Sequence, residues 1–526
     1  MILRRLRDLE AFLYGVPFHP FLFALYPVLL LYADNLNEVQ ASDVAGPLLL
    51  VLSVASAGYL LLARLTHQRH VVALISTALI IVILSFGRIS ELIEPVWAGD
   101  PRILAVVAIG LVVALAVAAY RGRDRLRSVT AAVNLASVVL LVLVVVPIGT
   151  FMADEWGRPN AVPPRTTGVA LAAETSTERD VYHLVFDRYG SAAAFDTAYG
   201  FDNGPFIDWL EDEGFVVVDD ARANYVRTTL SLASTLGMGL LDDVVETVGA
   251  DGGSYRPVVD RIQHSPAAHL LQDLGYEYIH IGSWFGDTRG SRIADRVFAA
   301  GRSESFLTAL SDLSIVPIVM EGRTYPGPSH ARSAQYQFDV LEEIADDPGP
   351  KYVFAHILLP HPPFVFLGDG TVDPGEADMR SQLAYTNGRI QALLDPFLRL
   401  PEDERPIIIL QADEGPYPQR QSDDINGFQW ADATDEELAT KFGVLMAFLL
   451  PGPEGEEPLP DSMSLVNTFP EVYGRYFGLT DYRQPDRSFT SQVSTPYALT
   501  EITHRLDPGS PDASGEVTAE QPTSGS

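Results

Sequence analysis

Five apolar runs fill most of the first 152 residues and constrain the fold more than any other feature of this chain. They lie near residues 19–34, 45–63, 71–87, 103–120 and 129–150. Each of the last four has close to the number of apolar residues, about 20, that a helix needs to cross a bilayer. The first run is shorter and is interrupted by Pro27. The sequence therefore predicts an N-terminal transmembrane domain of five helices at 1–152.

The charges in the loops between these runs predict a topology. Arginines gather at 4–7, 64–69 and 121–127, whereas the loops at 34–43 and 91–100 carry acidic residues. Because loops rich in arginine stay in the cytoplasm, we expect a cytoplasmic N-terminus and an extracellular C-terminal domain in a multi-pass protein of the plasma membrane. Few charges fall within the runs, so we interpret the runs as an anchor and not as a transport pathway.

The composition of the residues after 152 excludes some classes of binding partner and of chemistry. The formal net charge is −32, and almost all of the excess acid lies after residue 152, which argues against a nucleic-acid partner. The chain has no cysteine, so it has neither disulfides nor a thiol nucleophile. Residues 153–180 are rich in Pro, Thr and Ala and predict a linker. The polar tail at 506–526 predicts disorder.

Short apolar runs alternate with helical patterns between residues 181 and 505. Strands are expected at 181–186, 215–218, 276–281, 351–357, 406–411 and 443–450. This alternation predicts an α/β fold with a central, largely parallel sheet. The predicted organisation is thus a membrane domain of five helices followed by one α/β domain outside the cell.

Two of the expected strands end in acidic residues. The run 181–186 leads directly into Asp187, and the run 406–411 leads into Asp413 and Glu414. Both runs are apolar throughout, as in strands buried on both faces of a parallel sheet, and ligands bind beyond the carboxyl ends of such strands. Carboxylates delivered there from distant parts of the chain predict a hard-cation site or phosphate chemistry. The alternative is that each Asp only caps the turn that follows it.

Two threonines open a helical pattern in the segment ARANYVRTTLSLAS. They are Thr228 and Thr229. A helix N-terminus offers free backbone N–H groups and a partial positive charge, which suits phosphate. Either threonine could cap the helix. Either could instead be a nucleophile whose hydroxyl is activated by a metal ion held by Asp187 and Asp413.

Histidines and a Trp–Arg pair follow two further strands. In KYVFAHILLPHPPF, His356 ends a strand and His361 lies in a proline-rich loop, where either could ligate metal or contact a substrate phosphate. His356 could equally be a core histidine. In YIHIGSWFGDTRG, His280, Trp284 and Arg289 suit a polar head group, although a lone loop tryptophan also fits simple packing.

Taken in order, these segments resemble the alkaline phosphatase superfamily, in its sulfatase-like membrane branch. The lipoteichoic acid synthases and phosphoglycerol transferases of that branch are similar in having five membrane helices followed by one extracellular sulfatase-fold domain. The resemblance extends over both halves of the chain. The blocks that carry it are VFDRYG, YGFDNGPFIDWLEDEGF, NYVRTTLSLASTL, YIHIGSW, FAHILLPHPPF, IIILQADEGP and KFGVLMAFLLPG.

The resemblance implies a role for each matching position. Asp187 corresponds to the first acidic metal ligand, and Asp413 to the aspartate of a late Asp-His ligand pair. Thr228 corresponds to the nucleophile, which also faces the metal, with Thr229 as the fallback. His361 corresponds to a histidine that binds substrate near the metal. Three further positions lie about where relatives bind the glycerol-phosphate group: His280, Trp284 and Arg289.

The chain departs from the family pattern at two places. Asp413-Glu414-Gly415 replaces the usual Asp-His-Gly, and Asp187-Arg188 replaces the common Asp-Gly. A glutamate remains a workable ligand for a hard cation, and loss of the imidazole shifts the expected preference from Zn²⁺ or Mn²⁺ toward Mg²⁺ or Ca²⁺. The chain lacks the C/S-x-P-x-R motif that true sulfatases need, so sulfate-ester hydrolysis is not expected.

These features predict a membrane-anchored, metal-dependent phosphotransferase or phosphodiesterase of the sulfatase-like superfamily. It would transfer or hydrolyse a phospho-alcohol head group, of phosphoglycerol type, through a threonine nucleophile. The substrate would be a membrane lipid or a cell-envelope polymer, and the cofactor one divalent ion, Mg²⁺, Mn²⁺ or Ca²⁺. The alternative is a catalytically silent scaffold protein of the cell envelope, in which Glu414 marks a decayed metal site.

Overall fold

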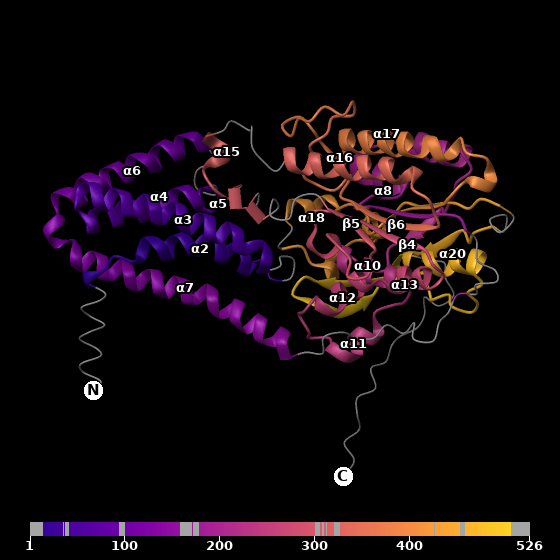
Figure 1. The fold of residues 1–526 in the computed structure, drawn as a ribbon, viewed down its shortest axis with the longest axis horizontal. Helices are drawn as coiled ribbons and strands as arrows, with labels where there is room; N and C mark the ends of the chain where they lie inside the picture. Colours follow the sequence, from indigo (N-terminus) through magenta and orange to yellow (C-terminus); the bar gives the residue numbers. More distant parts are fainter. Residues whose placement is uncertain are drawn as a thin grey trace, which may run out of the picture.

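The computed structural model describes most of residues 14–506. Outside the described residues lie 1–13, 35, 37–40, 94–99, 158–170, 172–177, 300–305, 308, 309, 312, 320–326, 425, 426, 453–457 and 507–526. Most of the predicted linker and nearly all of the predicted tail fall in these ranges, so both stay predictions. The described residues form an N-terminal group of helices followed by an α/β domain (Figure 1), as the sequence predicts.

All five predicted apolar runs are helical. Within the described residues the N-terminal helices are α2 (His19–Asp34), α3 (Ala41–Thr66), α4 (Arg69–Leu84), α5 (Phe86–Ile93), α6 (Pro101–Arg121) and α7 (Leu126–Gly157). The run predicted at 71–87 is not one helix, because it breaks at Ser85 between α4 and α5. By length and composition α6, α7 and residues 43–66 of α3 are able to cross a membrane, while α2 and α4 have 16 residues each. The number of crossings therefore stays a prediction.

The outer surface of this helical group is apolar. Large side chains on the long helices stay exposed, such as Val106 on α6 at 70% and Leu61 on α3 at 60%. Extended exposed apolar surface of this kind suits contact with lipid and not with water. The N-terminal region is therefore that of a membrane protein.

A seven-stranded sheet organises the α/β domain. Its order is β2-β8-β7-β1-β6-β4-β5. The strands are β1 (Val181–Phe186), β2 (Val216–Val217), β4 (Glu277–Gly282), β5 (Arg296–Ala299), β6 (Lys351–Ile357), β7 (Ile407–Ala412) and β8 (Met446–Leu449). The strands from β7 through β5 run parallel, whereas β8 is antiparallel to β7. The largely parallel sheet is thus confirmed, and β5 is a strand that the sequence patterns did not predict.

Helices cover both faces of this sheet. Figure 1 shows α16 and α17 on one side and α10, α12 and α13 on the other. The helices of the domain are α8 (Ala192–Tyr199), α9 (Gly204–Asp212), α10 (Thr228–Gly237), α11 (Asp242–Val248), α12 (Arg256–His264), α13 (Pro266–Asp273), α15 (Val316–Val319), α16 (Gly327–Glu343), α17 (Met379–Leu398), α18 (Gln419–Asp423), α19 (Asp435–Phe442), α20 (Thr468–Phe477) and α21 (Thr503–Leu506). Two small sheets pair β3 (Asp220–Arg222) with β9 (Ser462–Ser464), and β10 (Phe489–Gln492) with β11 (Thr495–Glu501). The double cover explains why β1, β6 and β7 are buried along their whole length.

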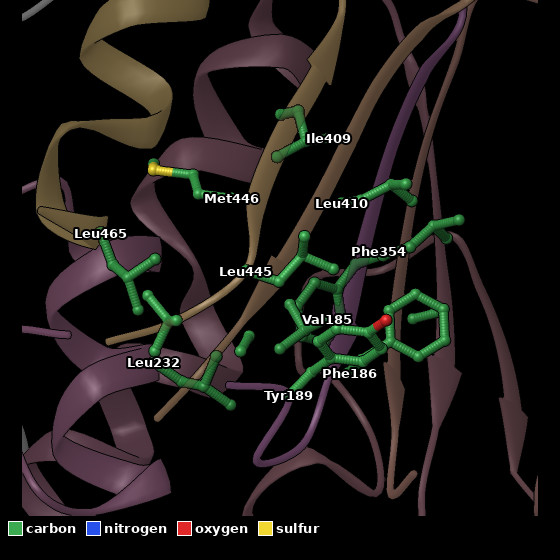
Figure 2. Close-up of a cluster of buried hydrophobic side chains, with 14 of the residues drawn as sticks. Val185, Phe186, Tyr189, Leu232, Phe354, Ile409, Leu410, Leu445, Met446 and Leu465 are labelled. Carbon is green, nitrogen blue, oxygen red and sulfur yellow. The ribbon is translucent and has the colours of Figure 1, made fainter. Parts of the chain in front are cut away.

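The register of the central strands fixes which side chains meet at their carboxyl ends. The core of these strands includes Val185, Phe354 and Leu410 (Figure 2). Val185 pairs with His356 on β6, and Phe186 pairs with Ala412 on β7. Since paired residues of parallel strands point to the same face and side chains alternate along a strand, the residues following Phe186 and Ala412 lie together at this edge. These residues are Asp187 and Asp413.

Candidate active site

Three buried residues at this edge form a group with the donors of a metal site. They are Asp187, His356 and Asp413, whose ligand atoms all lie within 4.8 Å of one another. His356 Nε2 is 3.4 Å from Asp187 Oδ2. Asp187 Oδ1 and Asp413 Oδ2 are buried without a hydrogen-bond partner among the described residues. Unpaired buried carboxylate oxygens are costly, and a divalent cation would satisfy them, so this donor set fits a metal ion.

The electrostatics of the two carboxylates point the same way. Burial, together with the charges of Asp187 and Glu414, raises the pKa of Asp413 to about 7. Burial also opposes ionisation of Asp187, but His361, His356 and Arg188 outweigh it and hold the pKa of Asp187 well below its ordinary value. Two acids at such close range disfavour each other's charged forms, and a bound cation removes that conflict.

Arg188 connects the end of β1 to the end of β7. Its backbone φ is +60°, in the left-handed region that favours glycine. In this conformation its N–H donates to Asp413 Oδ1 at 3.0 Å. Its guanidinium lies 3.6 Å from the ring centroid of Tyr417 and 3.3 Å from Glu414 Oε1. The departure from Asp-Gly noted in the sequence thus places a buried cation against the site.

Thr228 lies beside the metal group, at the first residue of α10. Its hydroxyl is close enough to the Asp413 carboxylate to lower the pKa of that acid. No side chain caps this helix end, so its backbone N–H groups remain available to an anion. Ser231 donates to the main-chain oxygen of Asp413 at 2.6 Å, which holds α10 against the end of β7. Thr229 points elsewhere, because its hydroxyl donates to Asp287 Oδ2 at 2.6 Å.

Glu414 lies in an ion-pair cluster next to the three-residue group. Its Oε1 accepts from Lys441 Nζ at 2.8 Å and from Arg188 Nε at 3.3 Å, while Oε2 has no hydrogen-bond partner among the described residues. The imidazole of the metal group comes from His356, for which the sequence left three roles open: metal ligand, substrate contact or core histidine. Whether Glu414 also ligates the ion stays a prediction.

The sequence patterns missed Lys441, although its rarity was a signal. The chain has only two lysines, Lys351 and Lys441. Both are fully buried and both pair with a carboxylate. Burial lowers the pKa of Lys441 to about 8 against the opposing charge of Glu414. Apart from histidine, all other basic side chains of this chain are arginines, and both lysines form compact buried ion pairs.

We expect Lys441→Met to destabilise the fold by about 3–5 kcal/mol, because it leaves the charge of Glu414 buried with only a longer contact to Arg188. The matched control is Lys351→Met, whose partner Asp180 is 21% exposed and can be hydrated. Urea denaturation of both variants measures the difference. Equal losses for the two lysines would contradict the assignment of a water-excluded Glu414.

His361 and His330 lie near Asp187, and Trp284 contacts both of them. The rings of Trp284 and His361 lie 6.1 Å apart, and Trp284 Nε1 donates to His330 Nδ1 at 2.9 Å. Burial and the charge of Arg188 lower the pKa of His361 to about 3, and burial lowers that of His330 to about 4. His330, on α16, is a second residue that the sequence patterns missed, because nothing local marks it.

Two of the predicted substrate contacts, His280 and Arg289, bind other residues of the protein through their polar groups. His280 is buried, with Nδ1 on the hydroxyl of Tyr278 at 3.0 Å and Nε2 on the carbonyl of Thr288 at 2.8 Å. Arg289 pairs with Asp43 of α3 at 2.6 Å. Neither leaves its main polar group to a substrate. Of the other predicted contacts, His356 and His361 lie near Asp187, and the ring of Trp284 lies beside that of His361.

Comparisons with known proteins give structural likeness only. No family model matches the chain, and no curated protein matches it. Solved structures that match include the periplasmic domain of EptC from Escherichia coli, at 12% identity and TM-score 0.42, over 63% of this chain and 96% of that chain. They also include the lipooligosaccharide phosphoethanolamine transferase EptA from Neisseria meningitidis, at 13% identity and TM-score 0.40, over 92% of this chain and 99% of that chain.

A third match is an alkaline phosphatase superfamily protein from Vibrio parahaemolyticus, at 13% identity and TM-score 0.36, over 62% of this chain and 75% of that chain. This is the superfamily that the sequence blocks resemble. What the chain shares with these structures is a similarity of fold.

Proposed function

We propose that this chain is a membrane-anchored, metal-dependent enzyme that transfers or hydrolyses a phospho-alcohol head group at the outer face of the membrane. One observation carries the proposal: a buried Asp187–His356–Asp413 group has unpaired ligand atoms beside Thr228, at an uncapped helix start. Cation, nucleophile and anion-binding helix end are the three components that phosphoryl transfer needs.

The ion would be held by Asp187, His356 and Asp413, with Thr228 facing it. A bound divalent ion supplies positive charge that lowers the pKa of a nearby hydroxyl and stabilises charge on phosphate oxygens. The donor set of this group includes one imidazole, that of His356, beside two carboxylates. Two carboxylates with one imidazole suit Mn²⁺ or Zn²⁺ better than Ca²⁺.

Each residue of the site would have a separate role in transfer of the head group. Thr228 Oγ1 would bond to phosphorus while the bond from phosphorus to the lipid oxygen breaks, and the threonine proton would leave with the lipid alcohol. A second alcohol, or water, would then bond to that phosphorus while the bond from phosphorus to Thr228 Oγ1 breaks, so that the phospho-alcohol group leaves on the acceptor and the acceptor's proton returns to the Thr228 hydroxyl. The N–H groups at the start of α10 would bind the equatorial oxygens, and His361 and Trp284 would line the head group.

The membrane helices support a lipid as the substrate. A lipid is confined to the membrane surface, so an enzyme anchored by α3, α6 and α7 meets it at high local concentration. We propose a phosphoglycerol-type head group, a cytoplasmic N-terminus and an extracellular α/β domain, in keeping with the arginine-rich loops at 64–69 and 121–127.

The test uses the purified full-length chain in lipid nanodiscs that contain phosphatidylglycerol with a labelled head group. Mn²⁺, Zn²⁺, Mg²⁺ and Ca²⁺ are added one at a time, and release of diacylglycerol is measured. We expect release with at least one ion and none with a chelator. A silent scaffold would give no release with any ion and no change in thermal stability on chelation, because an ion that binds only the folded state stabilises it.

A further inference from the structure

Three consecutive residues beyond β4 contact three different parts of the molecule. Asp287, Thr288 and Arg289 lie at the end of a short 3-10 turn. This turn folds back tightly on the strand, since a Cβ on Gly282 would lie 1.9 Å from the oxygen of Arg289. The turn is therefore packed directly against the end of β4.

Asp287 hydrogen-bonds to the first turn of α10, the helix that begins at Thr228. Its Oδ2 accepts from the Thr229 hydroxyl at 2.6 Å, and both side chains are buried. A short buried hydrogen bond to a carboxylate is among the stronger ones in proteins. The residue next to Thr229 is Thr228, so the position of Asp287 sets where the proposed nucleophile lies.

Thr288 holds the histidine of the metal group. Its Oγ1 lies 2.8 Å from His356 Nδ1, and its main-chain oxygen lies 2.8 Å from His280 Nε2. A hydrogen bond at Nδ1 leaves Nε2 of His356 to face Asp187. Partners of this kind fix the tautomer and the orientation of a metal-binding imidazole.

Arg289 binds the membrane domain. Its Nη1 lies 2.6 Å from Asp43 Oδ2 on α3, with both side chains at 15% and 9% exposure, and its Nη2 donates to the carbonyl of Trp284 at 3.2 Å. The same guanidinium thus touches the loop that carries Trp284 and the first turn of α3. Removing one partner of so buried a pair leaves an uncompensated charge.

A second contact supports this docking independently. Residues 313–315 of the α/β domain hydrogen-bond to the break between α4 and α5: Gly87 N donates to Leu313 O and Ile315 N donates to Ile83 O, both at 2.9 Å. Phe306 and Leu310 are buried in one cluster with side chains of α2, α3 and α7. Figure 1 shows α15, which follows residues 313–315 directly, beside α6. The backbone groups freed by the break at Ser85 are thus satisfied by the α/β domain.

We propose that the Asp287–Arg289 turn couples docking of the α/β domain on the membrane helices to the geometry of the metal and nucleophile site. When Arg289 is bound to Asp43, the turn is held where Asp287 and Thr288 fix Thr229 and His356. When the pair is broken, the turn is free to shift and both lose their orientation. The catalytic part of this inference rests on the proposed function, whereas the docking and ion-binding parts do not.

The first experiment breaks the pair in the full-length chain. We expect Asp43→Asn to weaken Mn²⁺ binding, measured by competition with a chelator, by about fivefold or more, and to lower kcat for lipid with KM little changed. The double variant Asp43→Arg/Arg289→Asp should recover most of both. The control is Asp34→Asn, which breaks an exposed pair with Arg88 in the same domain. If Asp43→Asn behaves like Asp34→Asn in both measurements, the coupling is wrong.

The second experiment tests the turn itself. Thr288→Val removes the hydroxyl and should weaken Mn²⁺ binding by about 10–100-fold, while Thr288→Ser keeps the hydroxyl and should restore it. Retention of full affinity by Thr288→Val would overturn the positioning role. Because ion affinity is read without turnover, a wild-type chain that binds Mn²⁺ but releases no diacylglycerol would refute the proposed function alone.

A third measurement reports docking directly, since the chain has no cysteine of its own. Gly87→Cys/Leu313→Cys places two thiols at the hydrogen-bonded contact. A short bifunctional thiol reagent should join them in high yield, and adding Asp43→Asn should lower the yield. Failure to cross-link in the otherwise wild-type background would refute the docked arrangement.

Discussion

Thr228→Ala is expected to lower head-group turnover by about 10³-fold or more, because it removes the oxygen that would bond to phosphorus. The side chain is small, partly exposed and lies at the first turn of α10, so the fold should tolerate the change. Diacylglycerol release from labelled nanodiscs gives the rate. Mass spectrometry of wild-type protein quenched during turnover should show phosphate, with or without its alcohol, on Thr228.

The control for this prediction is the adjacent Thr229→Ala. It removes the hydrogen bond to Asp287 but leaves the proposed nucleophile, so a smaller loss is expected. Thr228→Ser should keep part of the activity, since it retains a hydroxyl at the same place. The nucleophile assignment would fail if Thr228→Ala turned over at the wild-type rate, and would pass to Thr229 if only Thr229→Ala were inactive.

Asp413→Asn is expected to make the protein less stable than the wild type when the divalent ion is present, but at least as stable as the wild type when the ion is absent. In the wild type, adding ion at about 100 times its dissociation constant should stabilise the fold by about 2.7 kcal/mol. The variant should bind the ion weakly and gain little. Without ion, the variant should be at least as stable as the wild type, because burial and the charges of Asp187 and Glu414 already disfavour the charged form of Asp413.

Thermal melts with and without Mn²⁺ measure this reversal, and Asp395→Asn is the matched control because Asp395 is half-exposed and pairs with a surface arginine. The control should keep the full ion-induced shift. A metal site at this edge would be excluded if the wild type showed no shift with any divalent ion. A shift that survives Asp413→Asn would place the ion elsewhere in the protein.

Much of the architecture was predictable because it follows from local pattern. Continuous apolar runs such as 181–186 and 406–411 have few ways to be buried other than as central strands, so the acids that follow them had to meet at one edge of the sheet. Thr228 was visible as the start of an apolar helical pattern. The helices of the membrane region followed from length and hydropathy, although the break at Ser85 did not, because its freed backbone groups are satisfied by residues 313–315.

The pairings of polar side chains were not predictable in the same way. Glu414 follows a strand as a metal ligand would, yet its contact with Lys441 depends on where α19 meets the turn after β7, where Gly415 N donates to Lys441 O. From the sequence, His356 could be a core residue, a metal ligand or a substrate contact, and only its register against Val185 places it with Asp187. Arg289 fits a phosphate contact by its neighbours, whereas its partner lies 246 residues away.

The sequence by itself therefore determined the order of the elements, the membrane-anchored organisation and the three positions Asp187, Thr228 and Asp413. Hydrophobic periodicity is a local property, so it can be recognised from the order of the residues alone. The tertiary structure alone decided which imidazole completes the group and which cation faces Glu414. It also decided that Arg289 pairs with Asp43 of α3. Those choices depend on strand register and helix packing, which bring together side chains far apart in the chain and leave no local pattern to read.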